Sequence, residues 1–244
     1  EIRTPMNGIL GVADLLSRTN TDEQQNRYIN VLRLSAQNLL AIVNDVLDIE
    51  KILAGKMLLE HIPFDLSRTL ELLRDIFASE AERRQNRFVI DNTLDSTLQF
   101  MGDPFRISQV LTNLLSNAVK FTSNGLVRLQ VSAVNEDDET MILGFRVEDS
   151  GIGIPADKLQ EIFEPFSQVD FTARAGLLGT GLGLTICREI AVLMKGDITV
   201  ESQEGRGSVF TFELPLKKLQ SPAIARDVTI KDNRKLDGRR ILLV

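Results

Sequence analysis

The sequence predicts an α+β protein in which a helical hairpin is followed by an α/β sandwich, with helices on one face of a mixed sheet. Apolar side chains recur at intervals of three and four residues through residues 2–16 and again through residues 29–46, which is the spacing of one helical face. Beyond Gly55 this pattern gives way to short alternating runs interspersed with helices. The length of 244 residues is enough for one or two compact domains.

The hairpin carries more apolar surface than it can bury alone. Residues 2–16 form the first predicted helix, with Pro5 near its start, and the long second helix ends at Gly55. Thr21 and Gln24 have the spacing of a capping box for that second helix. Pairing of two hairpins into a dimeric four-helix bundle would bury the apolar faces, and we favour it over the alternative, packing of the hairpin onto the domain that follows.

The elements beyond the hairpin follow from shorter patterns. Helices are predicted over residues 66–82, 104–121 and 181–194, and Pro104 stands in a first turn that tolerates proline. Strands or extended segments are predicted over residues 57–64, 88–90, 98–101, 126–134, 141–147, 198–202 and 208–214. The polar, irregular residues 217–237 indicate a linker.

Composition argues against several classes of protein. With 28 Lys+Arg and 34 Asp+Glu, the net charge of −6 disfavours a nucleic-acid-binding protein, which needs clustered cations. One cysteine, Cys187, allows neither an internal disulfide nor a cysteine zinc site, which favours a reducing compartment. No apolar run reaches the ~20 residues of a membrane helix, so we expect this chain not to enter a membrane. The sequence begins and ends in the middle of recognisable sequence patterns, so we expect this chain to be a piece of a longer protein.

Two segments combine polar side chains in a way that suits a nucleotide. Asn113 and Asn117 lie four residues apart on one helical face, with Lys120 one turn further, where two amides and an ammonium suit a metal-bound phosphate chain. In residues 148–155 (EDSGIGIP), Asp149 follows a strand and precedes two glycines, where a carboxylate can accept a hydrogen bond from an exocyclic amine such as that of adenine. The alternatives are solvated amides and an ordinary surface turn.

Two further segments are rich in glycine. Residues 179–184 (GTGLGL) run into a helix, whose first N–H groups favour a phosphate, although the spacing is neither that of a P-loop nor that of a Rossmann fingerprint. Residues 205–210 (GRGSVF) form a tight turn that enters a strand. The alternatives here are a flexible loop and an ordinary hairpin.

In this order the four segments resemble the N, G1, G2 and G3 boxes of the sensor histidine kinases, and residues 162–166 (IFEPF) resemble their F box. Residues 1–7 (EIRTPMN) resemble the phosphoacceptor box without its histidine, and residues 103–109 (DPFRISQ) the lead-in to the N box. Residues 236–244 resemble the first strand of a receiver domain, which implies a hybrid kinase.

The resemblance implies that the chain is divided into four parts. Residues 1–55 would be the dimerisation and phosphotransfer hairpin, and residues 56–218 an ATP-binding catalytic domain of the histidine-kinase/gyrase type. Residues 219–237 would be a linker and residues 238–244 the start of a truncated receiver domain.

The resemblance also implies roles at the nucleotide. Asp149 would bind the adenine amine, with Gly151 and Gly153 behind it and Ser208 supporting the pocket. Asn117 would coordinate a Mg²⁺ ion that bridges the ATP phosphates. Asn113 and Lys120 would help to hold the phosphates. The remaining nucleotide-binding residues would form a mobile ATP lid and its apolar anchor: Gly179, Thr180, Gly181, Leu182 and Gly183 in the lid, and Phe163 and Phe166 in the anchor.

The phosphoacceptor box implies two catalytic residues besides Asn113. We expect the acceptor histidine directly before Glu1, which is then the candidate base, and Thr4 would position a water for dephosphorylation of a regulator. His61 lacks this context, and we interpret it as structural. Leu178 replaces a glycine that the family usually has, which predicts a stiffer or differently hinged lid.

Two other classes compete with a kinase. An ATPase of the same superfold places a glutamate base where Asn113 stands, and an amide takes up no proton. A non-catalytic scaffold is disfavoured by the presence of Asn117 and Asp149, although the altered lid favours it. For a kinase we expect a homodimer, a receiver domain in cis, and downstream phosphotransfer or response-regulator proteins. We expect the chain to be the cytoplasmic portion of a bacterial sensor kinase anchored in the inner membrane.

Overall fold

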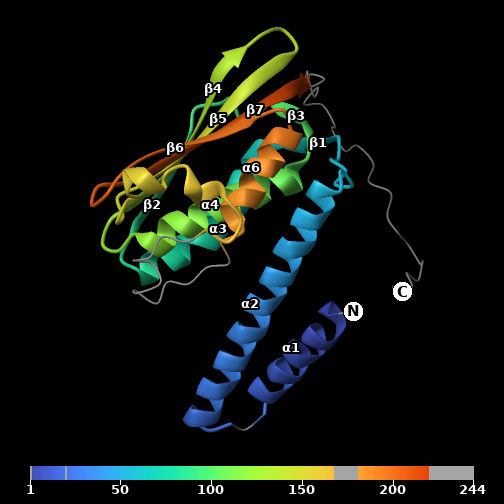
Figure 1. The fold of residues 1–244 in the computed structure, drawn as a ribbon, viewed down its shortest axis with the longest axis vertical. Coiled ribbons are helices and arrows are strands. Elements are labelled where there is room, and N and C mark those ends of the chain that lie inside the picture. The colour runs from blue at the N-terminus through green and yellow to red at the C-terminus, as the bar shows by residue number, and fades with distance from the viewer. Residues whose placement is uncertain (1, 20, 168–180, 220–244) are drawn as a thin grey trace, which may run out of the picture.

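The computed structural model describes residues 2–19, 21–167 and 181–219. The predicted α+β architecture is confirmed: a helical hairpin of α1 (Arg3–Ser17) and α2 (Glu23–Leu53) extends from a domain built of one sheet with helices on one face (Figure 1). Residues 220–244, which include most of the predicted linker and the receiver-like end, lie outside the described residues.

The second helix of the hairpin is capped one residue later than predicted. Asp22, not Thr21, is the N-cap: its Oδ1 accepts the Gln25 N–H at 2.7 Å, and the Gln25 side chain accepts the Asp22 N–H at 3.0 Å. The Thr21 hydroxyl instead bonds to the Asn26 side chain at 2.8 Å. The capping box is therefore present with a different pair of residues, because the carboxylate of Asp22 reaches the helix N–H groups.

The second domain begins after the turn at Gly55, whose φ of +64° ends the long helix. Its helices are α3 (Leu66–Arg83), α4 (Pro104–Phe121) and α6 (Gly183–Leu193), with short 3₁₀ turns η1 (Ala156–Lys158) and η2 (Glu161–Phe163). Its strands are β1 (Ile62–Asp65), β2 (Arg87–Asn92), β3 (Gln99–Gly102), β4 (Leu126–Glu136), β5 (Thr140–Asp149), β6 (Asp197–Gln203) and β7 (Gly207–Leu219).

The sheet is mixed, as predicted. Its order is β1-β3-β7-β5-β4-β2, with β6 also paired to β7; β2 and β4 are parallel and the other pairs are antiparallel. Strand β7 continues to Leu219, beyond the predicted end at residue 214 and into the segment interpreted as a linker, because it pairs with both β3 and β5 there. Conversely, residues 57–61 are not a strand.

The core lies between the sheet and the three long helices. Phe145 of β5 stacks on Phe212 of β7 with ring centroids 5.6 Å apart, and both side chains are fully buried. The inner face of α4 contributes the fully buried side chains of Ile107, Val110, Leu111, Leu114 and Leu115. This packing leaves the other face of α4 free to carry polar groups.

The hairpin contacts the second domain at the end of α2. Ile52 is buried there, and Asp48 Oδ2 accepts from Arg106 Nη1 at 3.1 Å and from Gln109 Nε2 at 3.0 Å. Among the described residues, the hairpin thus packs onto the second domain at this end, as the alternative to dimerisation predicts. Ile9, Val12 and other apolar residues of the hairpin stay exposed. In the described part of the chain, no helix combines the length and hydropathy that crossing a bilayer requires.

Candidate nucleotide-binding site

Asp149 is a buried carboxylate at the end of β5. Among the described residues, the other buried carboxylate is Asp103, which caps α4 by accepting the Arg106 N–H at 3.0 Å and also accepts the Glu60 N–H at 3.0 Å. Asp149 caps none of the described helices. Its Oδ1 accepts the Gly151 N–H at 2.8 Å, and Ser208, directly across from it on β7, bonds to it through its backbone and its hydroxyl.

The electrostatics of Asp149 reflect this burial. Loss of solvent raises the pKa of its carboxyl above the ordinary value, and the hydrogen bonds from Gly151 and Ser208 lower it in part. A carboxylate that is desolvated and hydrogen-bonded in this way is a fixed acceptor for a donor group on a ligand.

The glycines beside Asp149 are required by close backbone contacts. A Cβ atom on Gly151 would lie 2.4 Å from the Phe121 carbonyl oxygen, and one on Gly153 would lie 2.1 Å from the Gln203 carbonyl oxygen. Gly153 also has a φ of +68°, which disfavours other residues. The loop after β5 therefore packs against both the end of α4 and the turn between β6 and β7.

Helix α4 brings Asn113, Asn117 and Lys120 to one half-buried face. The helix begins cleanly because Asp103 caps it and Pro104 occupies the first turn. Burial lowers the pKa of Lys120, and the neighbouring Arg84 adds to this effect. The face is joined to the Asp149 loop because the Ile152 N–H donates to the Phe121 carbonyl at 3.3 Å.

Helix α6 starts against this face. A Cβ atom on Gly183 would lie 2.4 Å from the Asn113 side chain, so the first residue of α6 contacts α4 directly. Leu182, before it, is buried. Among the described residues, no side chain donates or accepts a capping hydrogen bond here, and the first turn holds no acidic residue. In the described structure the buried Oγ1 of Thr185, also in the first turn, has no hydrogen-bond partner. A phosphate group fits a helix start of this kind.

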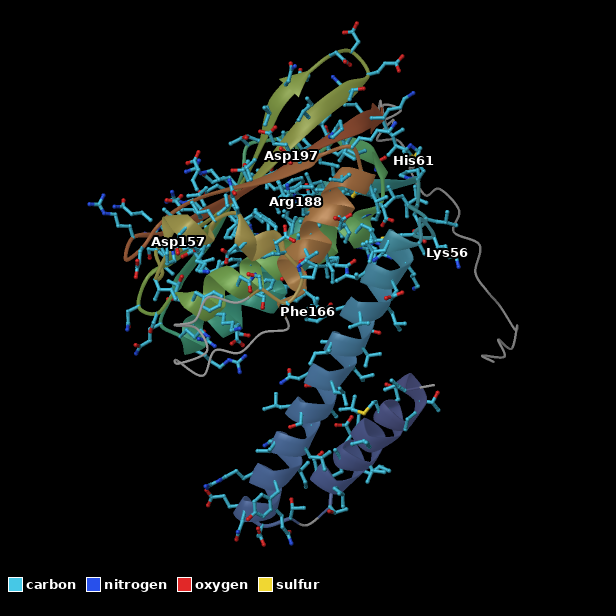
Figure 2. The ribbon with its side chains drawn as sticks, viewed as in Figure 1. Lys56, His61, Asp157, Phe166, Arg188 and Asp197 are labelled. Carbon is cyan, nitrogen blue, oxygen red and sulfur yellow. The ribbon has the colours of Figure 1, made fainter. Side chains whose placement is uncertain are left out.

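The two phenylalanines of the predicted anchor differ. Phe163 is buried, with the Arg188 guanidinium 5.5 Å from its ring centroid, whereas Phe166 is 71% exposed in the described structure (Figure 2). Phe166 uses its backbone instead, donating its N–H to the Gly181 carbonyl at 2.9 Å. This bond joins residues on either side of positions 168–180. Gly179 and Thr180 of the predicted lid lie outside the described residues.

Of the predicted phosphoacceptor residues, the described one, Thr4, lies on the hairpin, apart from the group around Asp149. Thr4 is exposed in the first turn of α1, and Glu1 lies outside the described residues. His61 is exposed just before β1, beyond the end of α2 that joins the second domain (Figure 2).

One residue of the site was missed in the sequence. Ser202 bonds to Ser208, the partner of Asp149, with 3.0 Å between the hydroxyl oxygens. The sequence does mark Ser202 in one way: it is a polar residue at the third inward position of β6, after Ile198 and Val200, where an apolar side chain is expected.

Two family models match the chain. Residues 1–55 match the His Kinase A (phospho-acceptor) domain, and residues 102–218 match the histidine kinase-, DNA gyrase B- and HSP90-like ATPase. Similar curated proteins include the autoinducer 2 sensor kinase/phosphatase LuxQ of Vibrio parahaemolyticus, 43% identical over 89% of this chain and 25% of LuxQ. The aerobic respiration control sensor protein ArcB of Escherichia coli is 39% identical over 100% of this chain and 31% of ArcB. The chain thus spans about a quarter to a third of the length of these relatives.

Solved structures agree. Full-length ShkA in complex with AMPPNP has a TM-score of 0.74 and 33% identity, over 90% of this chain and 45% of ShkA. The nucleotide-free catalytic domain of histidine kinase ThkA has a TM-score of 0.51 and 30% identity, over 64% of this chain and 97% of that domain. With a phospho-acceptor hairpin and an ATPase-like domain in this order, the chain belongs to the histidine kinases, in agreement with the resemblance seen in its motifs.

Proposed function

We propose that the chain is the catalytic core of an ATP-dependent protein-histidine kinase of a two-component system. The observation that carries this proposal is the meeting of a buried acceptor, Asp149, with the polar face of α4 and the start of α6. An adenine amine would donate to Asp149, and the phosphates would extend past Asn113 and Lys120 toward α6. The AMPPNP bound to ShkA supports a nucleotide of this class.

The side chains of the site suit Mg²⁺ only as an ion that binds together with the nucleotide. Among the described residues, no three His, Cys, Asp or Glu side chains are grouped to hold a metal. Asn117 offers an amide oxygen, and Mg²⁺ commonly combines few protein oxygens with substrate phosphates. The ion, when bound, would neutralise charge on the phosphates during transfer. Asn117 would hold it, and Asn113 and Lys120 would orient the phosphates.

Transfer to a protein side chain is favoured over hydrolysis. The Asn113 side chain contacts Gly183 at the start of α6, and an amide at this place is no base for a water molecule. The acceptor would be the histidine of the phosphoacceptor box, directly before Glu1, with Glu1 as base. The phosphoryl group would then pass to a receiver aspartate, in cis or on a downstream protein.

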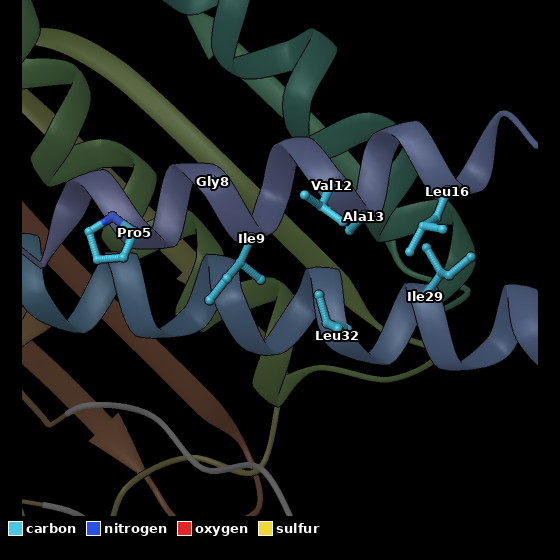
Figure 3. A pocket seen from close by; sticks show the side chains of 8 residues that line it. All are labelled: Pro5, Gly8, Ile9, Val12, Ala13, Leu16, Ile29 and Leu32. Carbon is cyan, nitrogen blue, oxygen red and sulfur yellow. The ribbon is translucent and has the colours of Figure 1, made fainter.

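The apolar surface of the hairpin supports a homodimer. Side chains of α1 and α2 line a groove of about 410 Å³ (Figure 3). Ile9, Val12, Leu16 and Leu32 in this groove are 42–57% exposed. A second hairpin would cover them in a four-helix bundle. We propose that the chain forms the cytoplasmic portion of a sensor kinase anchored in the inner membrane.

A second activity is dephosphorylation of the regulator. LuxQ is named a sensor kinase/phosphatase, and Thr4 is exposed on α1, where it can position a water.

The kinase proposal is tested with the full-length protein and γ-labelled ATP. We expect Mg²⁺-dependent label of two kinds: label on histidine, which is lost in acid and kept in base, and label passed to a receiver aspartate, which is lost in base. Label that survives both acid and base, or ATP hydrolysis without label, would contradict the proposal. Label mapped to His61 would contradict the assignment of the acceptor box.

A further inference from the structure

The hydroxyl of Ser202 joins three parts of the molecule that surround the candidate adenine pocket. Its Oγ accepts the Ile154 N–H at 2.8 Å, donates to the Gly207 carbonyl at 2.8 Å, and lies 3.0 Å from the Ser208 Oγ. Ile154 belongs to the loop after β5, and Gly207 and Ser208 begin β7. One half-buried side chain of β6 therefore connects the loop behind the pocket with the strand across from Asp149.

These bonds hold the loop after β5 in close backbone contact with the turn between β6 and β7. The Gly205 N–H donates to the Ile152 carbonyl at 2.7 Å, so the bonds at Gly205 and Ser202 bracket Gly153 on both sides. At Gly153 the backbones are so close that a Cβ atom would lie 2.1 Å from the Gln203 carbonyl oxygen. Of the two bracketing bonds, one joins two backbone groups, and only the other depends on a side chain.

Ser202 is also one hydrogen bond removed from Asp149. Ser208 is 6% exposed and bonds to the Asp149 carboxylate through its backbone and hydroxyl. A serine hydroxyl has one proton. The single Ser202 proton goes either to the Gly207 carbonyl or to the Ser208 oxygen, and in the second arrangement the Ser208 proton can point to the carboxylate.

We propose that Ser202 is a positioning residue for the adenine end of the nucleotide site, which fixes the loop at residues 150–154 against the start of β7, beside Asp149. The proposal rests on the proposed function, because it takes Asp149 as the adenine acceptor. Ser202 itself would touch no part of the nucleotide, so its effect would fall on binding of the base and not on the transfer of the phosphoryl group.

The test compares four variants of the full-length kinase, one of which, Asp149→Asn, removes the proposed adenine acceptor. Ser202→Ala removes the hydroxyl, Ser202→Thr keeps it, and the control Thr199→Ala removes an exposed hydroxyl from the same strand. For Ser202→Ala we expect the Kd values of ATP, ADP and adenosine to rise together by about five- to tenfold, the usual effect of a lost hydrogen bond. KM for ATP should rise by the same factor with kcat unchanged. Ser202→Thr and Thr199→Ala should bind like the parent protein.

Each other outcome overturns the inference. If Ser202→Ala binds nucleotides normally while Asp149→Asn binds them weakly, the adenine site stands and Ser202 does not position it. If neither variant weakens binding, the proposed adenine site is wrong as well. If Ser202→Ala lowers kcat as much as it raises KM, or if Ser202→Thr fails to restore binding, the residue acts on the fold and not on the base pocket.

Discussion

Replacing Asp149 by Asn alters the candidate adenine pocket by the smallest possible change. The variant keeps an oxygen that can accept the Gly151 N–H, which now lies 2.8 Å from Oδ1, and replaces the other oxygen by an NH₂ group. That NH₂ would face the amine of adenine, so two donors would meet in a buried place. An unpaired buried polar group costs ~1–3 kcal/mol, and we expect the Kd for ATP to rise roughly 5- to 150-fold.

The same substitution should not weaken the fold without nucleotide. Burial raises the pKa of the Asp149 carboxyl, so the folded protein binds more protons than the unfolded chain between the ordinary and the raised pKa. The free energy of unfolding therefore falls as the pH rises through this window. Because Asn carries no charge, the variant should be at least as stable as the parent at pH 7–8. Its advantage should shrink as the pH falls toward the ordinary carboxyl pKa.

Titration calorimetry with ATP, together with thermal unfolding of the nucleotide-free protein from pH 5 to 8, measures both effects. In the parent protein, ATP affinity relative to the variant should decrease as the pH is lowered, because protonation of Asp149 removes the acceptor. Equal affinities in the two proteins would refute the assignment of Asp149. A variant that loses affinity and thermal stability together would show that the carboxylate supports the fold instead.

Four other perturbations test separate parts of the structure. Asn117→Ala should lower Mg²⁺-dependent labelling at least about 100-fold, which is more than the loss of a residue that only supports a metal ligand, and should leave thermal unfolding unchanged. Retained labelling would mean that another residue binds the metal. Val12→Glu should convert the dimer to a monomer in sedimentation while ATP affinity stays the same, and a persistent dimer would show that another surface joins the protomers. A double-mutant cycle on Asp48 and Arg106 in denaturant should give a coupling of ~1–2 kcal/mol, whereas additive effects would mean that the pair does not hold the hairpin to the second domain. Thr4→Ala should reduce phosphatase activity more than kinase activity, and the reverse result would exchange the roles we assign.

Local patterns determined the types and most of the bounds of the elements. The predicted helix at residues 104–121 agrees with α4 to the residue, because Asp103, Pro104 and a strong apolar face all act within a few residues of one another. Local signals placed the cap of α2 one residue too early: the spacing of Thr21 and Gln24 predicts a capping box, whereas Asp22 and Gln25 form it. Strand β7 extends into a polar segment because pairing with its neighbours, not composition, stabilises it.

The candidate site also divides into features that local sequence patterns predict and features that tertiary structure decides. The sequence by itself identified Asp149, Asn113 and the glycines, since each belongs to a short motif. Tertiary structure alone decided that Ser208, 59 positions further along, lies across from Asp149 in the antiparallel pair of β5 and β7, and that Gly183 contacts Asn113. Tertiary structure also decided which loop bonds to Ser202, because the residues around a serine in a strand do not indicate which distant segment its hydroxyl will contact. Motifs encode which chemical groups are present, whereas strand register and helix packing bring groups distant in the chain within hydrogen-bond reach.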